Sequence, residues 1–265
     1  MELVKNRVAP KSGIPTSGLG VLVGYPKGGK TTLAASFPDS YVLELEPGGG
    51  DRVDGRIHDI KTLAELRNLL PLLMKESAIK TIVIDTVDVL SGWMENEIAA
   101  EVGLEAITDR KEGVNGFELW GKFKTRMEKL TTYLKASGKL ALLIAHTRDA
   151  KTNEDGQVIS PAGINVPGKS GSFIAAQADF IGFVSKKELG SGLVYSVSFK
   201  GGPLGTWGSR IKEINGKTIV LSEKNPYQSF ADAFKVSGNG KTAAAPTLKT
   251  APKAGKKKAK TKGRG

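Results

Sequence analysis

A short run near the start of the chain, GYPKGGKT at residues 24–31, has the residue types and spacing of a phosphate-binding loop. Gly24, Gly28 and Gly29 lack the Cβ atoms that would hold backbone N–H groups away from phosphate oxygens. Lys30 offers a positive charge to the β and γ phosphates, and the Thr31 hydroxyl is suited to ligate Mg²⁺. The expected binding residues for ATP are Gly24, Tyr25, Pro26, Lys27, Gly28, Gly29, Lys30, Thr31 and Thr32.

The sequence on either side of this loop supports the interpretation. An apolar run, GLGVLVG, precedes it and a run of small residues, KTTLAASF, follows it, as expected for a strand and a helix. A helix that begins near Gly29 directs its N-terminus, with free N–H groups, at the same anion. The alternative is a glycine-rich turn that binds nothing.

Carboxylates at the ends of apolar runs are the next candidates for chemistry. In KTIVIDT, Asp85 closes a strand-like run about fifty residues beyond the loop, which is the usual position of a Walker B aspartate. Such an aspartate holds Mg²⁺ through water beside the loop threonine, so Thr31 and Asp85 are the expected metal residues. Alternatively, Asp85 only caps a turn or a following helix.

A second pair of carboxylates lies in YVLELEPGGG. Because side chains alternate across a strand, Glu44 and Glu46 are expected to project to the same face. Glu46 is nearer the carboxyl end and precedes a flexible PGGG run, so it is the candidate to orient the attacking water, with Glu44 as support. The alternative is that both are surface or paired carboxylates.

One histidine completes the expected catalytic set. His146 ends the apolar run LALLIAH, where a polar group can sense the γ-phosphate and pass its state to the next loop. A lone histidine is also commonly a structural residue with satisfied hydrogen bonds. The predicted catalytic residues are Lys30, Glu46, Asp85 and His146.

Alternation of apolar runs with longer amphipathic stretches predicts the elements that must position these residues. Strands are expected at 19–23, 40–45, 81–85, 140–145, 180–184, 194–199 and 218–221, and helices at 30–36, 62–74, 91–102, 116–136 and 171–178. Runs such as TIVID are almost wholly apolar, as in parallel sheets with helices on both faces. Ligands of such α/β sheets bind beyond the carboxyl ends of the strands, where the candidate residues lie.

Length and composition limit the other possibilities. The chain has 265 residues, 39% of them hydrophobic, and one compact domain is expected over residues 1–236. The absence of cysteine excludes disulfides and thiolate zinc sites, and two histidines disfavour a histidine-rich metal centre. The first residues, MELVKNRVAPKSG, contain no apolar signal region, and no run is long enough to span a membrane, so a cytoplasmic protein is expected.

The net charge of +12 is concentrated at the C-terminus. Residues 237–265 carry nine Lys and Arg and no Asp or Glu, so the other 236 residues carry only +3. This segment is rich in Ala, Pro, Gly and Lys and lacks aromatic residues, so it is expected to be a disordered cationic arm. It either contacts nucleic-acid phosphates or only keeps the protein in solution.

In order and spacing, GYPKGGKT, LELEP, TIVIDT and LLIAHTR resemble the core of RecA-type recombinases over roughly residues 15–225. The short chain is similar to phage RecA-like single-strand annealing proteins, which are also described as phage nucleotide-binding or AAA-family ATPases. The resemblance implies an α/β fold with a RecA-like P-loop core, a mostly parallel sheet with helices on both faces, and an antiparallel C-terminal extension. In that family the residue at the position of Glu46 activates water. The residue at the position of His146, often glutamine, couples ATP to a DNA-binding loop.

Two segments correspond to the DNA-binding loops of that family. The first is TDRKEGVNGFELW, and the second is the long, Gly- and Pro-rich run DAKTNEDGQVISPAGINVPGKSGSF, which begins at residue 149. The resemblance implies that Lys151 and Lys169 meet DNA phosphates and that Phe173 or Trp120 contacts a base.

Family members also use a late cation to reach the ATP of a neighbouring subunit. Lys200, which ends the run YSVSFK, and Arg210 are the candidates. Either one acting in this way implies a ring or filament with ATP at the subunit interfaces.

The preferred hypothesis is an ATPase that binds single-stranded DNA and acts in recombination or annealing, with ATP ordering the two loops. A single-strand-binding protein is a further candidate partner. One alternative is a helicase- or loader-type DNA motor, and another is a non-catalytic, nucleotide-gated scaffold. A small-molecule phosphotransferase is disfavoured, because it needs an arginine-rich lid that the sequence does not show.

Overall fold

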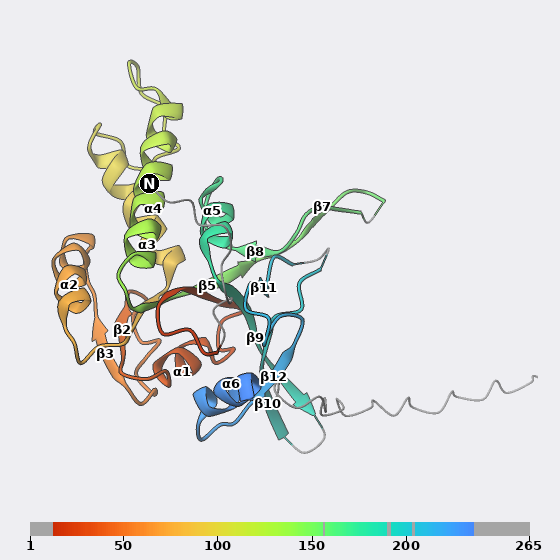
Figure 1. Ribbon diagram of the computed structural model, residues 1–265. Helices are drawn as coiled ribbons and strands as arrows, with labels where there is room; N and C mark the ends of the chain where they lie inside the picture. The colour runs from red at the N-terminus through yellow and green to blue at the C-terminus, as the bar shows by residue number, and fades with distance from the viewer. Residues whose placement is uncertain (1–12, 156, 190–191, 203–204, 236–265) are drawn as a thin grey trace, which may run out of the picture.

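The computed structural model describes residues 13–155, 157–189, 192–202 and 205–235 (Figure 1). A mixed sheet runs through it in the strand order β12-β10-β9-β1-β5-β4-β2-β3. Its strands are β1 (Gly18–Gly24), β2 (Ser40–Glu44), β3 (Arg56–Asp59), β4 (Thr81–Asp85), β5 (Leu140–Arg148), β9 (Phe180–Leu189), β10 (Gly192–Ser198) and β12 (Thr218–Leu221). Two short strands, β8 (Gly163–Ile164) and β11 (Gly208–Ser209), pair with β5 and β9.

The strands from β9 to β3 are parallel and form the centre of the sheet. β1 and β4 are almost entirely buried, which explains why their sequences are continuous apolar runs. β5 lies between β1 and β4, with His146 level with Gly24. The loop after β1 and the carboxyl end of β4 are therefore separated by a single strand that ends in polar residues.

Helices cover both faces of the sheet. On one face lie α2 (Leu63–Lys75), α3 (Val87–Ala100), α4 (Gly116–Lys135) and α5 (Ser170–Gln177), and on the other lie α1 (Lys30–Ala35) and α6 (Pro226–Lys235). Four of them begin at a side-chain cap: Thr62, Thr86, Asn115 and Asn225 accept hydrogen bonds from backbone N–H groups in the first turns of α2, α3, α4 and α6. Thr86 places the start of α3 four residues before the predicted Ser91.

The C-terminal part of the sheet is antiparallel, because β10 runs against both β9 and β12. Phe180, Phe199 and Phe230 join this extension and α6 into the core on the α1 face. The predicted α/β class, with a mostly parallel sheet, helices on both faces and an antiparallel C-terminal extension, is confirmed. β3, β8, β11 and α6 were not predicted.

The long segment after β5 is not the irregular loop that its Gly and Pro content predicts. It contains a hairpin of β6 (Lys151–Thr152) and β7 (Val158–Ser160), followed by β8. The hairpin turn is closed by hydrogen bonds between Asn153 and Gln157, one between backbones at 2.9 Å and one to the Asn153 side chain at 2.7 Å. The hairpin projects from the body of the molecule (Figure 1).

Two further expectations concern membrane-spanning helices and the C-terminal segment of the chain. None of the helices in the described ranges is long and apolar enough to cross a membrane. The predicted cationic arm, residues 237–265, lies outside the described residues. The division of the chain near residue 236 stays a prediction.

Candidate functional site

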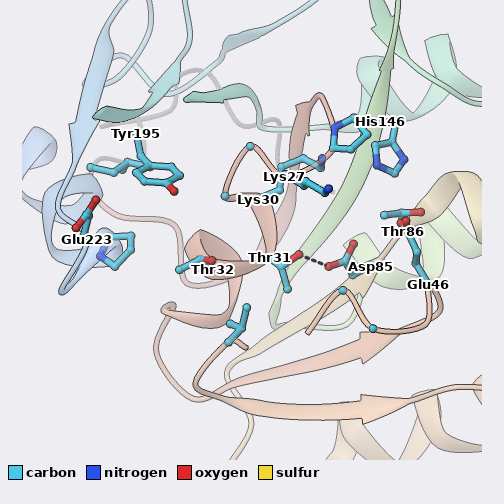
Figure 2. A pocket seen from close by; sticks show the side chains of 18 of the residues that line it. Lys27, Lys30, Thr31, Thr32, Glu46, Asp85, Thr86, His146, Tyr195 and Glu223 are labelled. Carbon is cyan, nitrogen blue, oxygen red and sulfur yellow. Dashed lines mark hydrogen bonds between the residues drawn. The ribbon is translucent and has the colours of Figure 1, made fainter. Parts of the chain in front are cut away.

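A pocket of about 600 Å³ lies at the carboxyl end of the parallel strands (Figure 2). Its lining combines residues 26–32, the loop 46–49, the ends of β4 and β5, and residues of β10, β12 and the segment leading into α6. The four predicted catalytic residues, Lys30, Glu46, Asp85 and His146, all line this one pocket. Its size suits a small molecule such as a nucleotide.

The glycines of the phosphate loop are needed for packing as well as for access to a ligand. A Cβ on Gly24 would lie 2.3 Å from the carbonyl oxygen of Val184, and one on Gly29 would lie 2.9 Å from the ring of Tyr195. Gly29 also has φ of +92°, which side-chain-bearing residues rarely adopt. The loop therefore depends on glycine at the points where it touches β9 and β10.

Lys30 lies across the loop that precedes it. Its buried ammonium donates hydrogen bonds to the carbonyl oxygens of Gly24 (3.1 Å) and Tyr25 (2.9 Å). Burial lowers the pKa of Lys30, while the carboxylates of Asp85, Asp88 and Glu46 act in the opposite direction. A positive charge is thus held at the floor of the pocket beside three acidic side chains.

Thr31 and Asp85 are in direct contact. The Thr31 hydroxyl donates a 2.6 Å hydrogen bond to Asp85 Oδ2, and Asp85 is only 4% exposed. Burial raises the pKa of Asp85, opposed by the Thr31 hydroxyl and by Lys30. The alternative role of Asp85 as a helix cap is not observed, since the neighbouring Thr86 caps α3.

This pair of oxygens fits the chemistry of a Mg²⁺ site. No group of three or more His, Cys, Asp or Glu suited to a metal ion occurs in the described ranges. Mg²⁺ commonly takes only one or two protein oxygens and completes its shell with phosphate oxygens and water. Thr31 and Asp85 are suited to that mode of binding.

Glu44, the last residue of β2, and Glu46, two residues beyond it, have different environments. β2 ends at Glu44, so the alternation of a strand does not extend to Glu46. Glu44 is buried and accepts a hydrogen bond from the backbone N–H of Gly50. Burial raises its pKa, and the nearby Asp59 carboxyl adds to the effect. Glu44 thus stabilises the loop that carries Glu46, and only Glu46 is exposed and lines the pocket.

His146 reaches the pocket from the end of β5. Its Nδ1 lies 2.7 Å from Asp88 Oδ2, and its backbone N–H donates to Asp88 Oδ1 at 2.8 Å. Asp88, in the first turn of α3, was not among the predicted residues. The exposed side chain of Tyr25 donates a 3.0 Å hydrogen bond to Asp149 and does not line the pocket.

The opposite end of the pocket was missed by sequence reasoning. Tyr195 of β10, Leu221 of β12 and the segment from Ser222 to Pro226 line it, and Figure 2 shows Tyr195 and Glu223 on the far side of the loop from Asp85. The ring of Tyr195 lies against Gly29. No local sequence pattern marks these residues, because their position depends on β10 and β12 joining the same sheet.

The residues predicted to contact DNA are dispersed. Lys151 is exposed at the start of the β6–β7 hairpin, and Lys169 is exposed immediately before α5. Phe173 is half-buried and lines a groove against α4, while Trp120 packs edge-on against Phe123 at 5.6 Å. The structure therefore does not bring the two aromatic side chains together with the hairpin.

The two cations proposed to act on a neighbouring subunit do not line the pocket of their own chain. Lys200 is exposed beyond the end of β10, which runs toward the amino ends of the parallel strands. The Arg210 guanidinium donates a hydrogen bond to the carbonyl oxygen of Ala176 at the end of α5. Arg210 therefore has a partner within its own chain.

The fold and this site define a P-loop nucleotide-binding protein: a glycine-rich loop between β1 and α1 faces a buried aspartate at the end of β4. The chain belongs to the family described as AAA domain (AAA_24), whose model matches residues 19–227. That match includes every residue that lines the pocket.

The similarity of this chain to two solved structures is low in both sequence identity and TM-score. One is a KaiC-like protein from the hyperthermophilic archaeon Pyrococcus horikoshii, with 16% identity, 77% of this chain and 85% of that chain covered, and a TM-score of 0.44. Another is the flagellar accessory protein FlaH from Methanocaldococcus jannaschii, with 16% identity, coverage of 79% and 86%, and a TM-score of 0.37. No curated protein matched the sequence. Family membership therefore rests on the AAA domain match.

Proposed function

We propose that this chain is a Mg²⁺-dependent ATPase that binds single-stranded DNA and acts in recombination or annealing. The observation that carries the proposal is the convergence of Lys30, Thr31 and Asp85 on one pocket whose rim holds Glu46 and His146. The AAA domain match supports the ATPase part. The resemblance to RecA-like annealing proteins supports the DNA part.

The roles in hydrolysis follow from the position of each side chain. Backbone N–H groups of the loop and the Lys30 ammonium hold the phosphates, and Thr31 and Asp85 hold Mg²⁺, which neutralises phosphate charge when bound. Glu46, an exposed carboxylate at the rim, orients the attacking water. Tyr195 and the segment from Ser222 to Pro226 take the base and ribose at the other end.

The proposed link to DNA runs along β5. This strand carries His146 at the pocket and continues through Arg148 into the β6–β7 hairpin, which holds Lys151. Lys169 precedes α5, whose N-terminal N–H groups also favour a phosphate. A nucleotide that changes the position of His146 therefore acts on a segment with two exposed cations.

Self-association into a ring or filament is part of the proposal, with a single-strand-binding protein as a further partner. Lys200 is the better candidate to reach a neighbouring subunit's ATP, because it is exposed and the Arg210 guanidinium is bound to Ala176. The predicted cationic arm, residues 237–265, adds salt-sensitive affinity for DNA.

Fluorescence anisotropy with a labelled single strand tests the proposal, with and without ATP and Mg²⁺. The proteins to compare are the full chain, a version ending at Val236, Lys30→Ala, and the double variant Lys151→Ala/Lys169→Ala. A matched control is Lys61→Ala/Lys75→Ala, which removes two exposed lysines at the ends of α2.

The proposal expects ATP-dependent binding that survives removal of the arm and disappears with Lys30→Ala. Binding should weaken about tenfold or more with Lys151→Ala/Lys169→Ala, since each phosphate contact adds to affinity. The control should bind like the full chain. Binding that depends only on residues 237–265 and ignores ATP contradicts the proposal. Strand separation driven by hydrolysis would instead indicate a DNA motor.

A further inference from the structure

Asp88 accepts three hydrogen bonds from two residues that line the pocket, Thr86 and His146. Its Oδ1 accepts from the backbone N–H of His146 (2.8 Å), and its Oδ2 accepts from the Thr86 hydroxyl (2.8 Å) and contacts His146 Nδ1 (2.7 Å). The Asp88 side chain is 13% exposed. A carboxylate with this set of donors has a fixed orientation.

The three residues connect two parts of the site that are far apart in the sequence. Thr86 follows Asp85 and caps α3, whereas His146 belongs to the strand that continues into the β6–β7 hairpin. Asp88 joins these two segments directly. Asp88 therefore connects the segment that follows Asp85, the proposed metal ligand, with the strand that leads into the β6–β7 hairpin proposed to contact DNA.

The contact with Asp88 also determines which nitrogen of His146 faces the pocket. A carboxylate accepts only, so Nδ1 carries a proton in this contact. Nε2 has no partner among the residues that the structure describes, and His146 lines the pocket. Nε2 is therefore the ring atom available to a ligand.

We propose that Asp88 is a positioning residue: its carboxylate keeps one proton on His146 Nδ1 and acts as counter-charge when Nε2 takes a second proton, so that Nε2–H donates to the terminal phosphate of a bound nucleotide. The inference rests on the proposed binding of ATP in this pocket. The charged side chains that line the pocket together with His146 are Lys27, Lys30, Glu46, Asp85 and Glu223, and Asp88 contacts the ring itself. Asp88 balances the charge of the doubly protonated ring, whose second proton comes from solvent.

Nuclear magnetic resonance of the histidine rings tests this assignment independently of hydrolysis. The chain has two histidines, so the variant His58→Gln leaves His146 as the only ring signal. Nitrogen shifts are recorded without nucleotide, with Mg²⁺ and ADP, and with Mg²⁺ and a non-hydrolysable ATP analogue, while calorimetry measures nucleotide binding in each variant.

The inference predicts a protonated Nδ1 in all states and a protonated Nε2 only with the ATP analogue. In Asp88→Asn this response should be lost while the analogue still binds with an affinity within about threefold. A ring that responds equally to ADP and to the analogue, or that responds in Asp88→Asn as in the unmodified chain, overturns the inference. Absence of nucleotide binding to the unmodified chain overturns the proposed function as well.

A kinetic cycle separates positioning from a purely structural role. Asp88→Asn should lower kcat for ATP about tenfold or more and change KM less than about threefold, because the interaction acts mainly after binding. In a His146→Gln background the same substitution should have little further effect. Asp109→Asn is the matched control, since Asp109 accepts a 2.8 Å hydrogen bond from the Ala106 N–H in an exposed turn away from the pocket. If Asp88→Asn lowers kcat equally in the unmodified chain and in the His146→Gln background, the inference is contradicted.

Discussion

The Thr31 hydroxyl donates a 2.6 Å hydrogen bond to Asp85 Oδ2 and so joins the start of α1 to the carboxyl end of β4. β5 lies between the strands that carry these two segments, so the contact spans its end. The two oxygens proposed to hold Mg²⁺ are therefore already adjacent. Asp85 reaches this position at the cost of burying a carboxylate, as the rise in its pKa shows.

Asp85→Asn should separate the functional and structural effects of this carboxylate. An amide of the same shape still accepts from Thr31 but removes the buried charge, so the nucleotide-free variant should melt a few degrees higher. Loss of the proposed metal ligand should lower ATP turnover about 100-fold or more. Calorimetric melting and a phosphate-release assay check both effects. A lower melting temperature with normal turnover would contradict the assignment.

Glu46→Gln should slow hydrolysis about 100-fold or more and leave ATP affinity within about threefold, because an amide cannot take a proton from water. Glu44→Gln is the matched control, since Glu44 is buried beneath the same loop and does not line the pocket. Single-turnover hydrolysis and ATP titration measure the two quantities. Similar rates for Glu46→Gln and the unmodified chain would favour the nucleotide-gated scaffold.

Glu44 should make stability dependent on pH. Burial raises its folded-state pKa above the ordinary 4.5, so its contribution is fully present below pH 4.5 and is lost as pH rises through the folded value. Glu44→Gln stays neutral and should therefore gain stability relative to the unmodified chain as pH rises. Urea unfolding at pH 5 and pH 8 measures this. If the free energies of unfolding of Glu44→Gln and the unmodified chain differ by the same amount at both pH values, the Glu44 proton does not contribute to stability.

Tyr195→Ala should weaken ATP binding about tenfold, because the ring lies against the phosphate loop and lines the end of the pocket assigned to the base. Tyr133→Ala, a change of an exposed tyrosine on α4, is the control. Binding of ATP and of inorganic triphosphate should be compared. A loss confined to ATP supports base contact, whereas equal losses would mean that Tyr195 only supports the loop.

The parts of the site that the sequence predicts are those encoded locally. The phosphate loop is contiguous, and Asp85 and His146 close apolar runs whose ends meet at one edge of a parallel sheet. Asp88 and Tyr195 carry no such signal. Asp88 requires β5 to lie beside β4, and Tyr195 requires an antiparallel strand to return beside β9.

The errors in the predicted elements have similar causes. β3 is a short, partly exposed edge strand without apolar alternation, so only its pairing with β2 identifies it. The hairpin after β5 is closed by a side-chain contact between Asn153 and Gln157 that composition does not reveal. For α6 a signal was present and overlooked: Asn225 accepts from the Gln228 N–H, and Pro226 begins the helix.

The most direct test of the central claim is calorimetric titration of ATP with Mg²⁺ into the full chain and into Lys30→Ala, with Lys124→Ala as control. Lys124 is an exposed lysine on α4 that pairs with Glu128 and lies outside the pocket. The account predicts one ATP per chain, dependence on Mg²⁺, at least about a hundredfold weaker binding for Lys30→Ala, and no change for the control. Thermal melting shows whether both proteins are folded. If they are, equal ATP affinity of Lys30→Ala and the unmodified chain would contradict the claim that this loop holds the nucleotide.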